Sequence, residues 1–502
     1  MAGIGFKLQK LLDEGTYFGV LKGFLFATFL IAGPWIVTVI VISLLNHFTR
    51  LQGNQYDILK TSIVYVYAFS LLLTGFYQMP LTRYLADELY AGRIESLVPS
   101  FLGMTMVVAT VQGVVGFGYS LLLPLSWFYR YTFMGGMVIV GLLWLAGIYL
   151  SCLRDFEIIG VLYIVGAILS LCFSLMFQKK FGLEGAFFGF IFGHALILMG
   201  LTFRILRELG LPGLMPSFVC LKSLVNYPDH LLAGLLYNMA IWVDKFLYWM
   251  SDYRQYPCRG LYSFGIYDTA IFLAYVTIIP ALGIFLMNVE TEFYLVYRKF
   301  YGAIIRQLSF RKIVESREDI KRVLMFTFFE MVKVQGALTL VVYYFAPEIL
   351  RKIHYVPELL STLRWGVWGA FFQALFLFVS LVLLYFEFAR EALWANFTFF
   401  AVNALLTGLI IHFRLDDYLA AGYVISTIMA FMQAVYFLRR GLRDLIFITF
   451  SRQPIPHEIP PAPPRVGKDG RLGEIVMIRS AIGADLINCI IPESALEEKA
   501  KK

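Results

Sequence analysis

The sequence predicts an all-α, polytopic membrane protein with twelve transmembrane helices. Apolar stretches of membrane-spanning length recur along the chain, as at residues 20–45, and a helix needs roughly 20 apolar residues to cross the hydrocarbon core. Hydrophobic residues make up 59% of the chain and charged residues only 15%, whereas soluble domains carry roughly 25% charged residues. A soluble fold could not bury so many apolar segments, but lipid can cover them.

Short polar joints separate the predicted spans. The spans cover residues 20–45, 61–82, 100–123, 132–152, 157–177, 183–203, 231–250, 266–288, 323–346, 364–386, 393–413 and 418–438. A longer joint at residues 204–230 divides them equally, which predicts two six-helix lobes at residues 1–203 and 231–443. The chain before the first span is expected to form an amphipathic helix on the membrane surface, and residues 444–502 a cytoplasmic, Pro-rich tether and tail.

The Lys and Arg residues of the joints predict an N-in, C-in orientation. If the N-terminus is cytoplasmic, most of these residues fall on the cytoplasmic side, as the positive-inside rule requires. The bias is concentrated in the joint at residues 289–322 and in the tail. The formal net charge of +8 then reflects loops that face anionic membrane lipids, and no nucleic-acid partner is predicted.

The strongest polar constellation within a span lies in the seventh. Asn238, Trp242 and Lys245 follow one another at i, i+4 and i+7, which places them in one stripe along a helix. Asp244 points roughly 100° away from Lys245 on such a helix and should need a partner on another helix. An ionisable side chain at membrane depth is costly unless it is paired or hydrated. These residues are therefore expected to face an interior cavity, with packing alone as the alternative.

A second ionisable pair lies in the ninth predicted span. Glu330 and Lys333 are spaced i, i+3 and can form an ion pair on one helical face. They either lock two helices together or line a central route, and the sequence favours neither. At the predicted outer end of the tenth span, Arg364, Trp365 and Trp368 match an interfacial belt, with contacts to sugar rings at an exit as the alternative.

Four residues are expected to break the helices. Gly33 and Pro34 are adjacent in the first span, and Pro80 and Pro280 each lie in the second span of a lobe. Such breaks free backbone carbonyls, which either line a cavity or are capped by neighbouring helices. The sequence contains no Walker A loop and no cluster of His, Cys and Asp with metal-ligand spacing. No enzyme activity, cofactor or metal site is therefore predicted.

Several stretches together resemble one family. They are GIGFKLQKLL at 3–12, AGPWI at 32–36, LTRYLADELY at 81–90, RDFEIIGVLYIVG at 154–166, YNMAIWVDKFLYW at 237–249, and residues 267–304. The combination resembles the PelG family, the inner-membrane transporter component of the Pel exopolysaccharide system, within the multidrug/oligosaccharidyl-lipid/polysaccharide (MOP) flippase superfamily. The tether and tail extend past the usual end of that family.

The resemblance implies two lobes around a central route. It also implies a polymer of N-acetylgalactosamine and N-acetylglucosamine, made by a cytosolic PelF-like glycosyltransferase, and a complex with PelD-like and PelE-like proteins in the bacterial inner membrane. Two other functions are compatible with the residues. The first is a cation-coupled exporter of small molecules or drugs, in which Asp244, Asp268 and Glu330 serve coupling. The second is a scaffold that anchors the glycosyltransferase and transports nothing.

Overall fold

The computed structural model describes residues 54–150, 157–210, 215–351 and 356–451, together with a few positions between 24 and 51. Within these ranges the chain is helical except for one short β-hairpin and the connecting turns. Most of the first predicted span lies outside the described residues, with Gly33 and Pro34. The predicted amphipathic N-terminal helix and the chain after Ser451 lie outside them as well.

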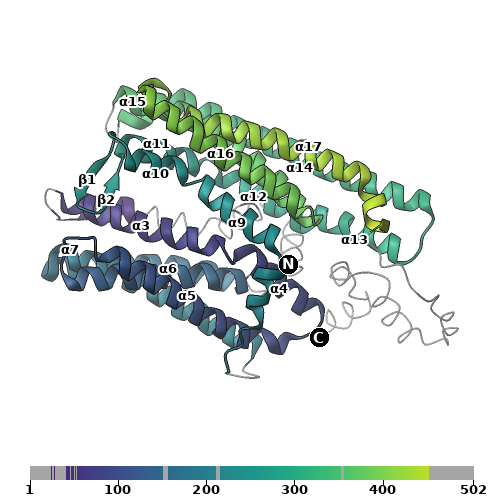
Figure 1. The fold of residues 1–502 in the computed structure, drawn as a ribbon, viewed down its shortest axis with the longest axis horizontal. Helices are drawn as coiled ribbons and strands as arrows, with labels where there is room; N and C mark the ends of the chain where they lie inside the picture. The colour runs from purple at the N-terminus through teal and green to yellow at the C-terminus, as the bar shows by residue number, and fades with distance from the viewer. Residues whose placement is uncertain are drawn as a thin grey trace.

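The first five described helices pack together, and we call them the N-terminal group. They are α3 (Gln55–Gly75), α4 (Gln78–Tyr90), α5 (Leu97–Ser120), α6 (Trp127–Leu150) and α7 (Glu157–Leu209). Helix α6 contacts α3, α5 and α7, and the group occupies the lower part of Figure 1. Buried aromatic rings contribute to this packing, as where Tyr129 of α6 stacks on Phe187 of α7 with centroids 4.7 Å apart.

Helix α7 consists of two antiparallel arms joined at Gly182. This residue has φ 57° and ψ −132°, a conformation that residues with a side chain rarely adopt. The arms run side by side, because Ser170 donates to the carbonyl of Phe190 at 2.9 Å and Ser174 donates to that of Ala186 at 2.8 Å. The arms correspond to the fifth and sixth predicted spans.

The helices from α9 onward form a second packed unit, the C-terminal group. They are α9 (Pro228–Ala240), α10 (Val243–Met250), α11 (Gly265–Val276), α12 (Ile279–Asn288), α13 (Tyr294–Ile305), α14 (Phe310–Arg351), α15 (Pro357–Tyr385), α16 (Ala389–Phe413) and α17 (Ala421–Ser451). Helix α15 is central and contacts α11, α14 and α17, in the upper part of Figure 1. The short helix α8 (Lys222–Asn226) lies in the predicted linker between the groups.

One β-hairpin departs from the all-α prediction. Strand β1 (Gln255–Cys258) pairs antiparallel with β2 (Leu261–Ser263), with Cys258 opposite Leu261. Arg259 and Gly260 form the two-residue connection, and glycine is common in such turns. An isolated hairpin is marginal in water, and this one lies against α3. Packing on the other group therefore stabilises strands that a short polar joint would not form alone.

Pro80 and Pro280 each follow a break between two helices. Pro80 lies in the first turn of α4, after the break that ends α3. Pro280 lies in the first turn of α12, after the break that ends α11. Proline fits a first turn because its missing N–H is not needed there. The second long apolar segment of each group is thus divided in the same way.

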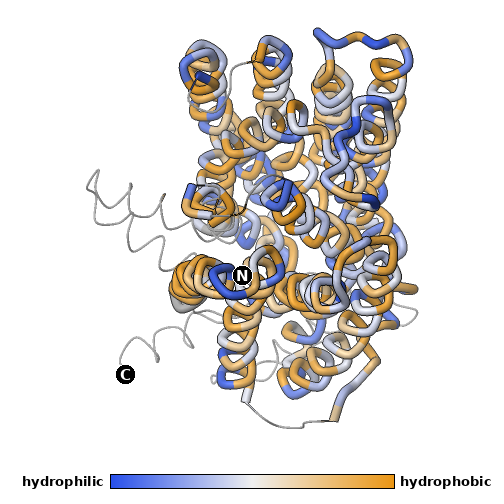
Figure 2. Tube along the Cα trace, turned by 90° about the vertical axis from the view of Figure 1, so that its left-hand side faces the viewer, coloured by the Kyte–Doolittle hydropathy of each residue, from blue (hydrophilic) through white to orange (hydrophobic). Residues whose placement is uncertain are grey.

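Nine helical stretches within the described ranges are long and apolar enough to cross a membrane. The two arms of α7 count as one stretch, whereas α9 and α10 are each too short to be counted. Hydrophobic residues run along most of the helices in Figure 2, and large apolar side chains such as Phe203 and Phe447 are 65% and 74% exposed. The chain is a multi-pass membrane protein. The number of twelve spans and the N-in, C-in orientation remain predictions.

Candidate transport site

A break in the seventh predicted span creates a buried polar centre. Helix α9 ends at Ala240 and α10 begins at Val243, although neither Pro nor Gly lies between them. Lys245 bridges the break, because its ammonium donates to the carbonyl oxygen of Ile241 at 2.9 Å. Its backbone N–H donates to a carboxylate oxygen of Asp244 at 2.8 Å. The Tyr275 hydroxyl also donates to the carbonyl of Ile241, at 3.4 Å, so two side chains satisfy a carbonyl just after the end of α9.

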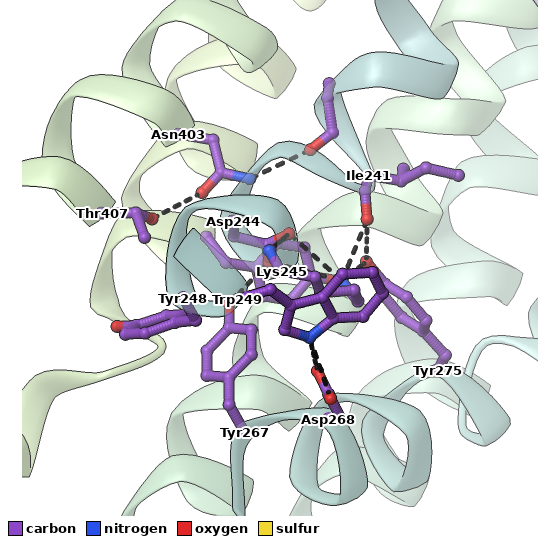
Figure 3. Close-up of polar contacts among 12 residues, drawn as sticks. Ile241, Asp244, Lys245, Tyr248, Trp249, Tyr267, Asp268, Tyr275, Asn403 and Thr407 are labelled. Atoms are coloured by element: carbon purple, nitrogen blue, oxygen red, sulfur yellow. Dashed lines mark hydrogen bonds and ion pairs between the residues drawn. The ribbon is translucent and has the colours of Figure 1, made fainter. Parts of the chain in front are cut away.

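Asp244 and Lys245 form a buried ion pair. Lys245 Nζ lies 3.2 Å from Asp244 Oδ1, and the two side chains are 8% and 0% exposed, respectively. Two tyrosines of α11 complete the surroundings (Figure 3). The Tyr267 hydroxyl donates to Asp244 Oδ2 at 2.6 Å, and Lys245 Nζ donates to the Tyr275 hydroxyl at 3.4 Å. A buried ion pair is tolerated only when its remaining donors and acceptors are satisfied, and these tyrosines meet that need.

Asp268 ties α10 to the start of α11. Its carboxylate accepts from the indole nitrogen of Trp249 at 3.1 and 3.2 Å and from the backbone N–H of Phe264 at 3.0 Å. A carboxylate in the first turn that reaches back to the residue before the helix favours helix initiation. Asp268, which opens its span, therefore positions one of the aromatic residues that join the two groups.

Helix α16 supplies side-chain amides that sequence reasoning missed. Asn403 donates to the carbonyl of Ala240 at 3.0 Å, and Asn396 donates to that of Ala233 at 2.9 Å. Thr407 in turn donates to Asn403 at 3.2 Å, as Figure 3 shows. The i, i+7 spacing of the two asparagines places them on one face of an apolar helix, and this pattern in the sequence could have identified them. These residues stabilise α9 up to its break.

Aromatic side chains join the two groups beside the ion pair. Tyr65 of α3 stacks on Trp249 of α10 with centroids 4.8 Å apart, and Phe69 stacks on Phe246 at 5.8 Å. Tyr119 of α5 packs against Phe69 at 5.2 Å. We call these five residues the aromatic seam. The seam is the main aromatic contact between α10 and the N-terminal group in the described chain.

Trp242 lies between the aromatic seam and the ion pair. Its ring centroid is 6.0 Å from that of Phe246 and 6.3 Å from that of Trp249, and Lys245 Nζ lies 5.7 Å from it. The indole Nε1 is buried yet has no hydrogen-bond partner in the described structure. Since buried N–H groups are normally bonded, Trp242 is an exception among the buried donors of this region.

The β-hairpin bridges the groups at one end of the seam. The Tyr65 hydroxyl donates to the carbonyl of Tyr262 at 3.0 Å, and the Tyr119 hydroxyl donates to that of Gly260 at 2.6 Å. The side chain of Asn54 donates to the carbonyl of Pro257. Two tyrosines of the seam therefore also hold the hairpin on the N-terminal group.

A charged cluster bridges the groups at the opposite end. Arg83 of α4 pairs with Asp87 at 3.3 Å and with Glu387, in the turn between α15 and α16. The Tyr227 hydroxyl donates to Asp87 at 2.8 Å, and burial together with this carboxylate raises the pKa of Tyr227. Glu387 has a φ of 61°, which is uncommon for a residue with a side chain. We call these four residues the Arg83 cluster.

Asn238 lies where α3 and α9 cross. Its side chain is 5% exposed and donates to the carbonyl of Leu71 at 2.9 Å. The helices approach closely because Gly75 and Gly234 face each other, and a Cβ at Gly75 would lie 3.1 Å from the Cα of Leu235. Asn238 therefore contacts the other group directly, whereas Lys245 bonds to Ile241, Asp244 and Tyr275 within its own group.

The ion pair of Glu330 and Lys333 is separate from that of Asp244 and Lys245. Lys333 Nζ lies 2.9 Å from Glu330 Oε1, but the side chains are 70% and 33% exposed. No hydrogen bond or ion pair connects them to Asp244 and Lys245 in the parts of the chain that the structure covers.

The predicted exit residues are half-buried on α15. Arg364 lies over the Tyr343 ring at 5.0 Å, and Trp365 packs against Tyr418 with ring centroids 6.0 Å apart. Trp368 packs on Phe371 at 6.0 Å.

The fold is similar to that of known transporters. An outward-facing structure of a multidrug resistance MATE family transporter of the MOP superfamily aligns with a TM-score of 0.61 and 14% identity, over 84% of this chain and 96% of that one. A MOP superfamily transporter from Pyrococcus furiosus aligns with a TM-score of 0.58 and 13% identity, over 83% and 96%. An inward-facing MATE family structure aligns with a TM-score of 0.54 and 12% identity, over 81% and 99%. At these identities the likeness shows the fold alone.

The sequence itself identifies a family. Comparison with curated proteins gives no match. A family model described as PelG, "Putative exopolysaccharide Exporter (EPS-E)", matches residues 1–450. Both the family and the fold are those of transporters and not of enzymes. The chain belongs to the PelG family of exopolysaccharide exporters.

Proposed function

We propose that the chain moves an N-acetylhexosamine-rich exopolysaccharide of the Pel type across the bacterial inner membrane, between the N-terminal and C-terminal groups. The exopolysaccharide exporter family and the transporter fold support this class of activity. In the proposed synthase complex, a PelF-like glycosyltransferase delivers the polymer from the cytosol, and PelD-like and PelE-like proteins are the membrane partners. In this proposal the two groups act as the two predicted lobes.

The unpartnered indole N–H of Trp242 beside the aromatic seam is the observation that carries the proposal. A neutral N-acetylhexosamine presents apolar ring faces, hydroxyl groups and an acetamido carbonyl. Aromatic rings can contact the apolar faces, and the Trp242 N–H can donate to a carbonyl oxygen. The charges of Asp244 and Lys245 are already paired, so this surface suits a neutral polymer.

Transport by this route requires the bridges between the groups to open. The hairpin contacts and the Arg83 cluster join the groups at opposite ends of the molecule. In the proposed cycle each bridge breaks in turn as the groups rotate relative to one another. By the predicted orientation, the hairpin faces outward and the Arg83 cluster faces the cytoplasm.

We include Glu330 and Lys333 in the route, with Arg364, Trp365 and Trp368 nearer its exit. An exposed ion pair about two turns inside the apolar part of α14, which begins near residue 323, would be costly against hydrocarbon. Water inside a transport route would hydrate the two charges, and contact with a partner protein would shield them from hydrocarbon.

Replacement of the Trp242 indole tests the proposal. The W242F variant keeps an aromatic ring and loses the donor, so export of polymer by cells that contain the partner proteins should fall at least fivefold at normal protein level. The matched control is W394F, because Trp394 is 49% exposed on α16 and lies outside the site. Export by W242F at the level of W394F would refute the assignment.

A cation-coupled exporter of small molecules is the second candidate. The buried carboxylate of Asp244 and the partly buried carboxylate of Asp268 beside it favour it, because such groups at membrane depth can bind a cation. Cells that express the chain without its partners would then gain resistance to cationic drugs, and the D268N variant would lose that resistance. The polysaccharide proposal predicts no resistance in either strain.

A further inference from the structure

The C-terminal group carries an apolar groove on its flank, away from the aromatic seam. Helices α14 and α17 form its walls and α15 its floor, and it encloses about 490 Å³. Its apolar lining includes Phe328 of α14, Val379 of α15 and Leu438 of α17. Volumes of roughly 300–1,000 Å³ are typical of sites for small ligands. The groove is large enough to hold part of an elongated apolar molecule.

One end of the groove is strongly basic. Lys321, Arg439 and Arg443 line it there. Lys321 pairs with Glu318 at 3.0 Å and Arg443 pairs with Asp444 at 3.0 Å. Arg439 is exposed and has no ion-pair partner among the residues that the structure describes. A free guanidinium beside two further cations favours a phosphate group.

An aromatic pair lies at the apolar end of the groove. Phe328 stacks on Phe431 with centroids 6.1 Å apart. Along α17 the residues that line the groove run from Val435 to Arg443, which is roughly 12 Å at the helical rise of 1.5 Å per residue. One leaflet contributes about half of the roughly 30 Å hydrocarbon core. The groove is therefore shorter than one leaflet and has room for part of an acyl chain beside the cations.

We propose that this groove binds an anionic phospholipid, with its phosphate at Arg439 and one acyl chain against Phe328 and Val379. Its charge and its apolar walls together identify the occupant. The cations select a negative headgroup, and the apolar walls accept part of an acyl chain. A polar segment of protein would leave the apolar walls uncovered, and a neutral lipid would leave Arg439 without a counter-charge. This site is independent of the route proposed above.

The experiment uses the purified full-length chain in phosphatidylcholine vesicles. Trace amounts of phosphatidylglycerol or phosphatidylcholine carry the same photoactivatable acyl chain, and mass spectrometry locates the cross-links. Labelling of residues 321–328 and 435–443 should be at least fivefold higher with phosphatidylglycerol. The R439Q variant should lower it about fivefold, equivalent to the approximately 1 kcal/mol of one basic residue near an anionic headgroup.

Arg440 provides a matched control. It is the next residue on α17 and is exposed, but it does not line the groove, so R440Q should keep wild-type labelling. V435W should block the chain without a change in charge and should also lower labelling. Equal labelling by the two lipids, or equal effects of R439Q and R440Q, would each overturn the proposal.

Discussion

Lys245 donates from its ammonium to the carbonyl oxygen of Ile241, four residues earlier, at 2.9 Å. In an unbroken helix a backbone N–H would occupy that position. The lysine therefore stabilises the break between α9 and α10 while its charge is balanced by Asp244. One side chain serves both the backbone geometry and the electrostatics of the buried centre.

This dual role predicts the effect of removing Lys245. The K245A variant leaves the carboxylate of Asp244 buried without its cation, which typically costs about 3–5 kcal/mol. The thermal unfolding midpoint in detergent and the level of protein in the membrane should both fall. The double variant D244N/K245M removes both charges and should recover most of the lost stability. A midpoint for K245A equal to that of the wild type would contradict the role assigned to the pair.

The sequence predicted the class of fold because the apolar spans are local features. Pro80 and Pro280 also mark where α4 and α12 begin, since proline restricts helix geometry wherever it occurs. The break before α10 contains no proline. Its stabilising contacts come from Lys245 and from Asn403 on a distant helix, so no local pattern could indicate it.

The candidate site also depends on contacts between residues that are distant in the sequence. The sequence placed Asp244 and Lys245 on different faces of one helix, and a partner for Asp244 on another helix was found in Tyr267. The direct contact between the neighbouring charges depends on the break. The aromatic seam depends on the packing of α10 against α3, which is a long-range contact that spacing within one segment does not encode.

The Arg83 cluster predicts a conformational effect of E387Q. Charge-assisted hydrogen bonds contribute roughly 1.5–3 kcal/mol, so loss of the Glu387 charge should raise the population in which this end is open about tenfold. Spin labels at T82C and R390C, both exposed positions, would report a longer and broader distance distribution in a background without the native cysteines. E391Q is the control, because Glu391 lies in the first turn of α16 outside the cluster. An identical distribution in E387Q and E391Q would show that the cluster does not hold this end closed.

The crossing of α3 and α9 predicts that a single methyl group at Gly75 weakens the contact between the groups. In G75A the new Cβ would lie 3.0 Å from Asn238 Nδ2 and 3.1 Å from the Cα of Leu235, and overpacking of this kind costs about 1–3 kcal/mol. The unfolding midpoint should fall. The control is G118A in α5, where a Cβ would meet nothing within 4 Å and where alanine favours the helix by roughly 0.5–1 kcal/mol. If G75A were as stable as G118A, the close approach would not matter for stability.

The exposed pair on α14 provides a test of the route with little effect on the fold. Glu330 and Lys333 are 33% and 70% exposed, and exposed ion pairs contribute about 0–1 kcal/mol. E330Q and K333Q should therefore unfold at nearly the wild-type temperature. If the pair lines the polymer route, both variants should reduce export severalfold at unchanged protein level. Normal export by both would remove these residues from the route, while a loss of co-purifying membrane partners would place the pair at a protein contact.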